Sequence, residues 1–442
     1  MTLSTHPRHG ALSAVAVLVV TCTLAARPAF ALQPVGEFLK HAKTWNPQNR
    51  AAHATTEQRD AEIGVSRGSY LPSFSATGTY TRNEYEVNTG ALTGGLSIPG
   101  LQNTIIQPLN QLDANLTLSV PIISVANWDR RAAAESTFAG ARADEANAEL
   151  SVEKGVLRDY YTLLGDEAVL LSAVKNVEVA QHNVTLARDR RAGGTGSELD
   201  VQRAVADQAR AEQSVTAAQL GVTNTRRDLY SLSGLTAEPA RGFPEDDLHE
   251  EEPLASWTGK AGGVPSVQSA SAGRKTAEQG VSTAKAALLP TVNASAQERF
   301  TNATAFIGGH SAVYLLQLTA SWKLDTTFVP GLRAQNAAAA AARANEDRAR
   351  QAAEDAVFRD WQQIHADIES ARSSRAQVTA AQLAASLAQD RYQGGVATQL
   401  DVLQARQDAF SADVARIQAD ADLAYARLAL RLDAGQLVKE TR

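Results

Sequence analysis

The chain has 442 residues, of which 44% are hydrophobic, 20% are charged and only 5% are aromatic. Its formal net charge of −6 disfavours nucleic-acid binding, because neutralisation of phosphates dominates that affinity. The single cysteine, Cys22, excludes an intramolecular disulfide and also excludes zinc sites built from paired cysteines.

The first element in chain order is a secretory signal peptide, predicted over residues 1–31. Arg8 supplies positive charge, residues 11–26 form an apolar run, and Ala29-Phe30-Ala31 matches a small-x-small cleavage site. A single anchoring helix is the alternative, but the run is shorter than the ~20 residues that cross a bilayer. Lipidation of Cys22 is left open. Since no later stretch is long and apolar enough, any membrane contact of the mature chain would use strands.

A tandem duplication follows the signal. Pro47 and Pro265 are 218 residues apart, and so are the pairs Leu71-Pro72 and Leu289-Pro290. Further along, residues 186–194 match residues 387–395 at a spacing of 201. The change in spacing places roughly 17 extra residues in the first copy, between positions 86 and 116, and insertions of this kind belong in exposed loops.

Each copy contains two segments in which apolar and polar residues alternate, as is typical of strands with one apolar face. Small hydroxyl side chains are common on the polar face, which suits a wide, water-filled interior. A soluble sandwich is the alternative for these segments taken alone. The predicted strands are 73–80, 115–122, 292–297 and 314–322.

Long helices are predicted where prolines are missing, because a proline inside a helix costs ~3 kcal/mol. We expect one helix over 128–192 and another over 333–393, each ~90–100 Å long. A glycine-rich turn and a second helix follow each of them, over 198–233 and 399–433. Helices of this length cannot be the core of one globule, so we expect coiled-coil hairpins.

The predicted organisation is mainly α with β. Residues 236–263 contain three prolines and two acidic runs, and we interpret them as an exposed linker between the copies. Four strands cannot close a barrel around a lumen, whereas three chains would supply twelve. The predicted segments are a signal peptide (1–31), a first repeat (32–235), an acidic, proline-rich linker (236–263), a second repeat (264–435) and a C-terminal tail (436–442).

This order of elements resembles the TolC-type outer-membrane efflux proteins, the outer membrane factor family. The resemblance is carried by Asn46-Pro47, by the Leu-Pro pairs before each first strand, and by the two turns at 191–201 and 392–402. Each motif alone is weak, but the doubled set at a fixed spacing is specific. The resemblance covers nearly all of residues 33–435.

The resemblance implies a homotrimer with a twelve-stranded barrel in outer-membrane lipid and a helical tunnel through the periplasm. It also implies docking to a periplasmic adaptor, or membrane fusion protein, and to an inner-membrane pump of an efflux or type I secretion system. Substrates would cross passively, with no catalytic residue, cofactor or metal. The cargo, whether drugs, metals or proteins, is left open.

Asp200 and Asp401 match the aspartates that follow the family's tip turns and surround its periplasmic entrance. On a three-fold axis each would form a ring of three carboxylates that favours cations. The simpler interpretation is that each aspartate lies in a first helical turn, where its charge is worth ~0.3–1 kcal/mol against the helix dipole.

Tyr392 matches the family's latch tyrosine, but Ala397 stands at the position of a latch arginine. The resemblance therefore implies a weaker latch, or one that uses Arg190 or Arg391. Both arginines could equally be solvated cations in the last turns of their helices.

The tips themselves are the family's adaptor-docking turns, and their glycines fit helix C-caps that require positive φ. The same glycines leave backbone exposed for a partner. Two aromatic residues near the last strand, Tyr314 and Trp322, are candidates for the membrane–water interface, with ordinary packing as the alternative. The predicted docking residues are Gly193, Gly194, Leu199, Gly394, Gly395 and Leu400.

Two other classes of protein compete with the channel. A periplasmic coiled-coil interaction protein similar to the adaptor itself would lack the four alternating segments. A secreted enzyme on a helical scaffold is disfavoured because no catalytic constellation is recognisable in the sequence.

Overall fold

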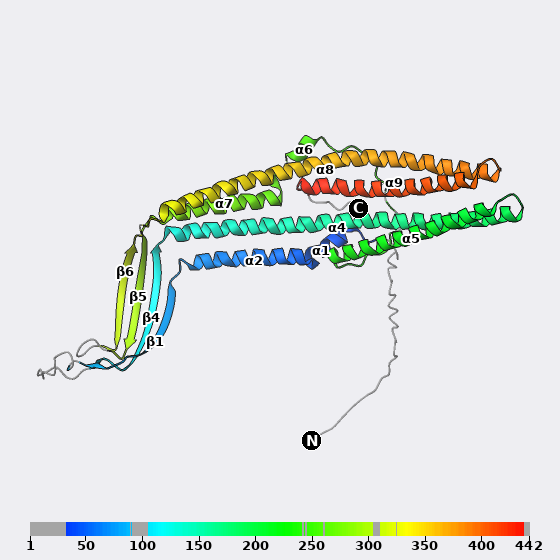
Figure 1. The fold of residues 1–442 in the computed structure, drawn as a ribbon. Helices are drawn as coiled ribbons and strands as arrows, with labels where there is room; N and C mark the ends of the chain where they lie inside the picture. Colours follow the sequence, from blue (N-terminus) through cyan, green and yellow to red (C-terminus); the bar gives the residue numbers. More distant parts are fainter. Residues whose placement is uncertain are drawn as a thin grey trace, which may run out of the picture.

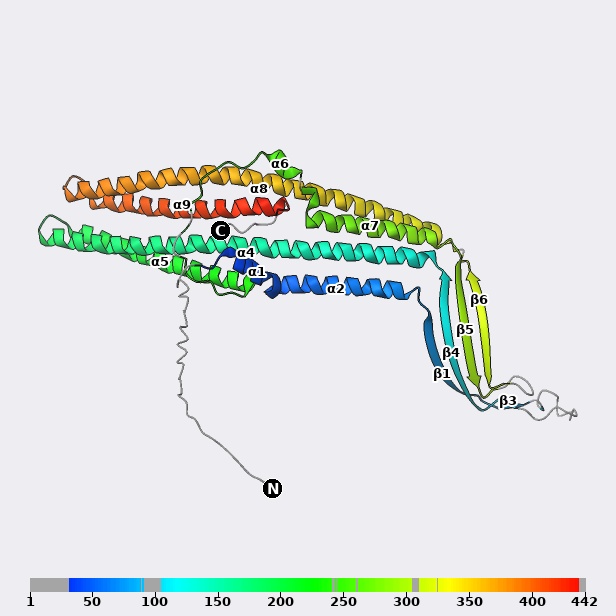
Figure 2. The same ribbon diagram turned by 180° about the vertical axis from the view of Figure 1, so that it is seen from behind.

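The computed structural model describes residues 32–436, except 89, 91–104, 241–242, 244, 260, 304–309 and 324. The predicted signal peptide with Cys22, and the predicted tail beyond Gln436, lie outside these residues. The described helices lie side by side in one long rod, and a narrow sheet leaves one end of the rod at a steep angle (Figures 1 and 2). Within the described residues, no helix is long and apolar enough to cross a membrane.

Four helices of the first copy build half of the rod. Helices α1 (Val35–Trp45) and α2 (Pro47–Gly68) precede the sheet, and α4 (Val125–Ala192) and α5 (Glu198–Ser233) follow it. Pro47 is tolerated because a first-turn residue needs no N–H partner. Asn46 caps α2 by accepting a hydrogen bond from the Gln48 amide at 2.8 Å.

The second copy repeats this arrangement with α7 (Pro265–Ala286), α8 (Phe328–Gln393) and α9 (Gln399–Asp433). Helix α4 has 68 residues and α8 has 66, so each is ~100 Å long, as predicted. The expected start of α8 at residue 333 is wrong, since the helix begins at Phe328 and contains Pro330. A proline in the first turn removes no helical hydrogen bond, so it does not mark the boundary.

The four predicted strands form one antiparallel sheet in the order β1-β4-β5-β6. They are β1 (Ser73–Arg82), β4 (Asn110–Ile123), β5 (Thr291–Thr301) and β6 (Ala312–Ser321). The two copies therefore meet at the central β4–β5 pair. The extra residues of the first copy include a second small sheet, formed by β2 (Val87–Asn88) and β3 (Ile105–Gln107).

The register of this sheet gathers its apolar side chains on one face. Phe74 is opposite Leu118, and Ala296 is opposite both Leu118 and Leu316. Alternate positions place Ser75, Thr117 and similar residues on the other face. Leu316 is 72% exposed. In this chain the apolar face is therefore uncovered, which is rare for a contiguous apolar surface in water.

The helices are held together by separate apolar clusters along the rod. One cluster joins α1, α4 and α5 through Phe38, Val156 and Leu229. Another joins α4 to α9 through Leu157 and Leu428. Full burial of such a side chain is worth about 1.5–3 kcal/mol. The two hairpins of the chain therefore pack on each other as well as internally.

The segment between the copies is only partly exposed, because its second half packs against the second hairpin, and in that respect the prediction of an exposed linker is wrong. Its short helix α6 (Leu254–Thr258) buries Trp257, which is 5% exposed, against Val357 and Ile364 of α8. The two acidic runs suggested that water surrounds this segment. The apolar residues between and after these runs, however, pack into the core of the second hairpin. We call residues 245–258 the strap.

Candidate functional site

Both tips of the rod end in the same glycine turn. After α4, the Thr195 amide bonds to the Arg190 carbonyl, and after α8 the Val396 amide bonds to the Arg391 carbonyl, each at 2.9 Å. This six-to-one bond is the mark of a Schellman motif, which needs a left-handed residue next to the helix end. Gly194 and Gly395 supply it, with φ of 76° and 77°.

The prediction of positive φ is thus confirmed for Gly194 and Gly395 but wrong for Gly193 and Gly394. The latter two have φ of −76° and −74° and belong to the right-handed region. They are the C-cap residues that directly follow α4 and α8, and the change of hand occurs only at the second glycine of each pair.

Alanine substitutions at the second tip should separate these two roles. Gly395→Ala is expected to destabilise the turn by about 1–2 kcal/mol, because it places a Cβ in the left-handed region. Gly394→Ala is the matched control, since its Cβ would meet only ordinary contacts at 3.5 Å. Hydrogen exchange at the Val396 amide measures the difference, and equal protection in both variants would contradict this assignment.

Asp200 and Asp401 both close capping boxes. The Asp401 carboxylate accepts from the Thr398 amide at 2.8 Å, while the Asp401 amide donates to the Thr398 hydroxyl at 3.2 Å. Asp200 and Ser197 exchange the same pair of bonds at 3.2 and 3.1 Å. The Thr398 backbone bond lowers the pKa of Asp401, so its carboxylate is charged at neutral pH. The first-turn role is therefore present at both positions.

Arg190 connects the two tips of one chain. Its guanidinium lies over the Tyr392 ring, with the carbon 4.3 Å from the ring centroid, and it also donates to the Tyr392 carbonyl. Burial raises the pKa of Tyr392, so the ring stays neutral around pH 7. The structure thus brings together two of the predicted latch residues. Arg391 is exposed, and no described contact joins its side chain to the first tip.

Sequence reasoning missed a further ion pair, between Arg191 and Glu198 across the first turn. It stays within one tip, whereas the Arg190 contact crosses between tips. The predicted docking residues Leu199 and Leu400 are exposed at 58% and 53%, and Val396 beside them is exposed at 68%. Apolar side chains therefore extend from the end of the rod.

Tyr314 and Trp322 lie on the apolar side of the last strand, near its two ends. They are 77% and 66% exposed. The separation of eight residues in extended chain spans ~26 Å, close to the height of the apolar band of membrane barrels. The Trp322 indole donates to the Leu288 carbonyl at 2.9 Å, which fixes its orientation at the base of the sheet.

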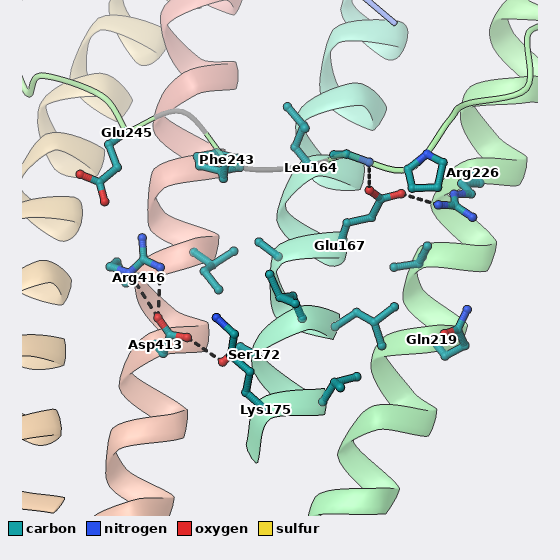
Figure 3. Close-up of a pocket in the computed structure, with 18 residues that line it drawn as sticks. Leu164, Glu167, Ser172, Lys175, Gln219, Arg226, Phe243, Glu245, Asp413 and Arg416 are labelled. Carbon is teal, nitrogen blue, oxygen red and sulfur yellow. Dashed lines mark hydrogen bonds and ion pairs between the residues drawn. The ribbon is translucent and has the colours of Figure 1, made fainter. Parts of the chain in front are cut away.

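A hollow of about 520 Å³ lies between α4, α5 and α9, where the chain crosses from the first copy to the strap (Figure 3). Two pairs of oppositely charged side chains lie in its wall. Arg226 bonds to Glu167 at 2.6 Å, and Arg416 bonds to Asp413 at 3.0 Å. Glu167 also accepts a hydrogen bond from the Ala240 amide, which fixes the crossing segment to the first hairpin.

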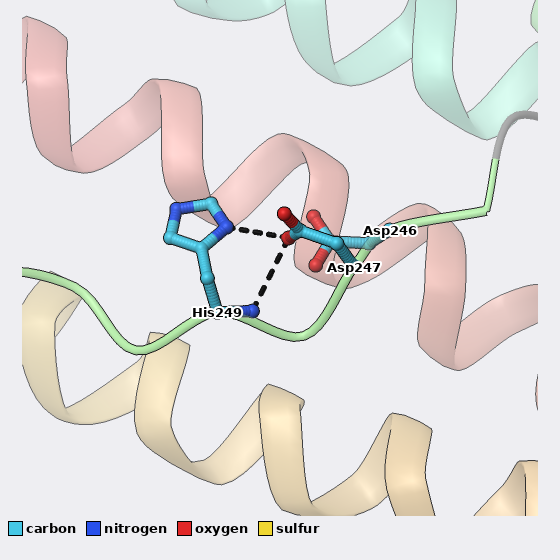
Figure 4. A group of neighbouring side chains, drawn as sticks. All are labelled: Asp246, Asp247 and His249. Atoms are coloured by element: carbon cyan, nitrogen blue, oxygen red, sulfur yellow. Dashed lines mark hydrogen bonds and ion pairs between the residues drawn. The ribbon is translucent and has the colours of Figure 1, made fainter.

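Asp246, Asp247 and His249 of the strap lie close together (Figure 4). Both oxygens of Asp246 accept hydrogen bonds from the Arg427 guanidinium, at 2.8 and 2.9 Å. Glu251 accepts another at 2.6 Å. An arginine side chain therefore supplies the positive charge for this acidic group.

Comparisons with known proteins agree with this geometry. The family model for outer membrane efflux proteins matches residues 39–235 and 263–436. Over 438 residues the chain is 23% identical to outer membrane efflux protein BepC of Brucella suis, covering 97% of this chain and 91% of BepC. It is also 27% identical to protein CyaE of Bordetella pertussis over 418 residues, covering 90% of this chain and 82% of CyaE.

Among solved structures, the crystal structure of the Campylobacter jejuni CmeC outer membrane channel superposes with a TM-score of 0.78 at 16% identity. The match covers 93% of this chain and 87% of CmeC. The fold predicted from the doubled turns and strands is confirmed by this likeness. The chain therefore belongs to the outer membrane efflux protein family, whose members are channels of the outer membrane rather than enzymes.

Proposed function

We propose that three copies of this chain form one conduit that leads from the periplasm to the cell exterior. The sheet carries this proposal. In the order β1-β4-β5-β6, the two outer strands each have one described neighbour, so each leaves an edge free to pair. Pairing β6 of one copy with β1 of the next would close twelve strands and place the apolar face in lipid. Tyr314 and Trp322 would then lie at the two interfaces.

The helical rod would extend from this barrel into the periplasm and end at the two glycine tips. Exposed Leu199, Leu400 and Val396 offer an apolar surface there. Family membership implies a periplasmic adaptor and an inner-membrane pump as partners. We place the adaptor's helical hairpins on this apolar surface, because helices commonly bind through such side chains.

The capping aspartates would have a second role at the entrance of the conduit. A three-fold axis at the tips would collect three copies each of Asp200 and Asp401 around the pathway. Asp401 is ionised at neutral pH and is largely exposed. A ring of such carboxylates attracts cations and repels anions.

Bilayer recordings test both parts of this function. The purified protein should come from the outer-membrane fraction as a trimer and show a small, cation-selective conductance. Asp401→Asn should weaken cation selectivity and relieve block by divalent cations, because it removes three charges from the entrance. The Asn side-chain oxygen can still accept the hydrogen bond from the Thr398 amide, so the capping box at the start of α9 is largely kept.

Asp408→Asn, on an exposed position further along α9, is the control for charge removal. If Asp401→Asn leaves selectivity and block unchanged, the aspartate is a cap and nothing more. A monomer that is soluble without detergent and shows no conductance would overturn the conduit, and an adaptor-like coiled-coil protein would replace it.

A further inference from the structure

A polar junction joins three helices at the level where α9 ends. Lys154 of α4 forms an ion pair with Asp433, the last residue of α9. Asp360 of α8 lies against the same Asp433 carboxylate. The Asp360 Oδ2 atom is enclosed and has no hydrogen-bond partner among the described residues. Two carboxylates from the second hairpin thus share one ammonium from the first.

The three junction residues line a cavity of about 420 Å³ between α4, α8 and α9. Arg359 on α8 and Lys154 on α4 favour the charged form of Asp360, and Asp433 on α9 opposes it. Arg158 of α4 is bonded to its neighbour Asp159 at 3.3 Å. The other polar side chains in the cavity wall are Gln363, Asp367, Asp422 and Tyr425.

This cavity lies on the side of the hairpin that faces away from the strap. Arg427 and Asp420 contact the strap or its partner Arg375, and Ala429 and Asp422 line the cavity. A shift of two residues turns a side chain by about 200° around a helix. If three copies form the proposed conduit with the strap on its outer surface, the junction faces the interior.

We propose that Asp360, Asp433 and Lys154 form a proton-operated tie between the two hairpins. In the closed tie, neutral Asp360 donates a hydrogen bond to the Asp433 carboxylate, which is paired with Lys154. When Asp360 loses its proton, two carboxylates face one ammonium, and their repulsion loosens the end of α9. The tie therefore strengthens in acid and weakens in base.

The pH window follows from the environment of Asp360. Burial first, and the Asp433 carboxylate second, raise the pKa of Asp360 to about 7, whereas an unfolded aspartate titrates at about 3.9. Between these values the folded state holds more protons than the unfolded state, so stability falls as pH rises. The contribution of the tie is complete below pH ~4 and is lost above pH ~7.

The duplication provides a matched control. Asp159 lies 201 residues before Asp360, at the equivalent position of α4. The equivalent of Asp433 in the first copy is Leu232, so the second carboxylate is missing there. Asp159 is paired with Arg158 instead. Asp159→Asn therefore removes a partly buried carboxyl without breaking a shared-proton pair.

Infrared titration of the full chain in detergent reads the proton directly. A protonated carboxyl signal that disappears near pH 7 should be lost in Asp360→Asn and kept in Asp159→Asn. Asp433→Asn should move the titration to lower pH, because Lys154 then faces Asp360 alone. Survival of the signal in Asp360→Asn, or its equal loss in Asp159→Asn, would overturn the proposal.

Hydrogen exchange in the last turn of α9, corrected for intrinsic rates, reads the tie itself. Protection should fall about tenfold between pH 6 and pH 8 in the natural chain and stay constant in Asp360→Asn. Equal pH dependence in both would refute the tie. Neither the infrared titration nor the exchange measurement requires a conducting trimer. If the protein shows this titration but no conductance, the proposed conduit is wrong and the proposed tie still holds.

Discussion

Arg427→Ala is expected to release the strap from the second hairpin. The Arg427 side chain is only 7% exposed and holds Asp246, Glu251 and the His249 carbonyl at once. Burial alone would lower the pKa of the guanidinium, but its bonds to Asp246 and Glu251 outweigh burial and raise the pKa. Its removal leaves two shielded carboxylates without their cation.

Breaking a buried ion pair on one side costs about 3–5 kcal/mol, because the remaining charge stays desolvated. If the strap opens locally, its opening equilibrium rises by roughly 100-fold or more. Limited proteolysis and hydrogen exchange over residues 245–258 measure this change. Trp257 fluorescence reports the same event, since the indole leaves its cluster with Val357 and Ile364.

Arg372→Ala is the matched control on the same hairpin. Arg372 is 53% exposed and pairs only one turn along α8 with Glu369, so its loss is worth at most ~1 kcal/mol. Protection of the strap should be unchanged in that variant. If Arg427→Ala also leaves protection unchanged, the apolar contacts of Trp257 and Leu254 hold the strap without the ion pairs.

The hairpin helices were predictable because local signals mark their ends. The second helices begin at residues 198 and 399 and end at 233 and 433, as expected. Ser197 and Thr398 provide capping boxes, and glycine pairs precede them. Such signals act within one turn of the chain and need no tertiary contact to be recognised.

Strand ends and the strap were less predictable because tertiary pairing sets them. β4 begins at Asn110, five residues before its alternating pattern, since β1 offers a partner for each of those residues. The strap looks like a solvated acidic loop in sequence, yet Arg427, nearly two hundred residues away, neutralises it. One sign was available: Leu248, Leu254 and Trp257 are apolar residues within an otherwise polar segment.

At the candidate site, the residue types were predictable but the pairing was not. A lone arginine in the last turn of a helix fits a dipole interaction as well as a latch. Only the packing of α4 beside α9 brings Arg190 to Tyr392, a contact between positions two hundred residues apart. The family resemblance implied that both tips lie at one entrance but not which side chains meet there.

The second large effect is expected at this contact between the tips. Arg190→Ala removes the guanidinium over the Tyr392 ring and its bond to the Tyr392 carbonyl, so the two tips of a chain can separate. A cation–π contact is worth about 0.5–2 kcal/mol. If the tips close the conduit, the ratio of open to closed states rises roughly 2- to 30-fold. Single-channel conductance and open probability measure this change.

Neighbouring variants separate the latch from a general loss of charge at the entrance. Arg191→Ala removes the same charge but only the ion pair with Glu198 inside the first tip, so gating should stay unchanged. Tyr392→Phe keeps the ring and should resemble the natural chain, whereas Tyr392→Ala should resemble Arg190→Ala without adding to it. Because burial keeps the Tyr392 phenol neutral, this latch should be insensitive to pH around 7, unlike the Asp360 junction. Equal conductance in Arg190→Ala and Arg191→Ala would show that the contact between the tips does not control the entrance.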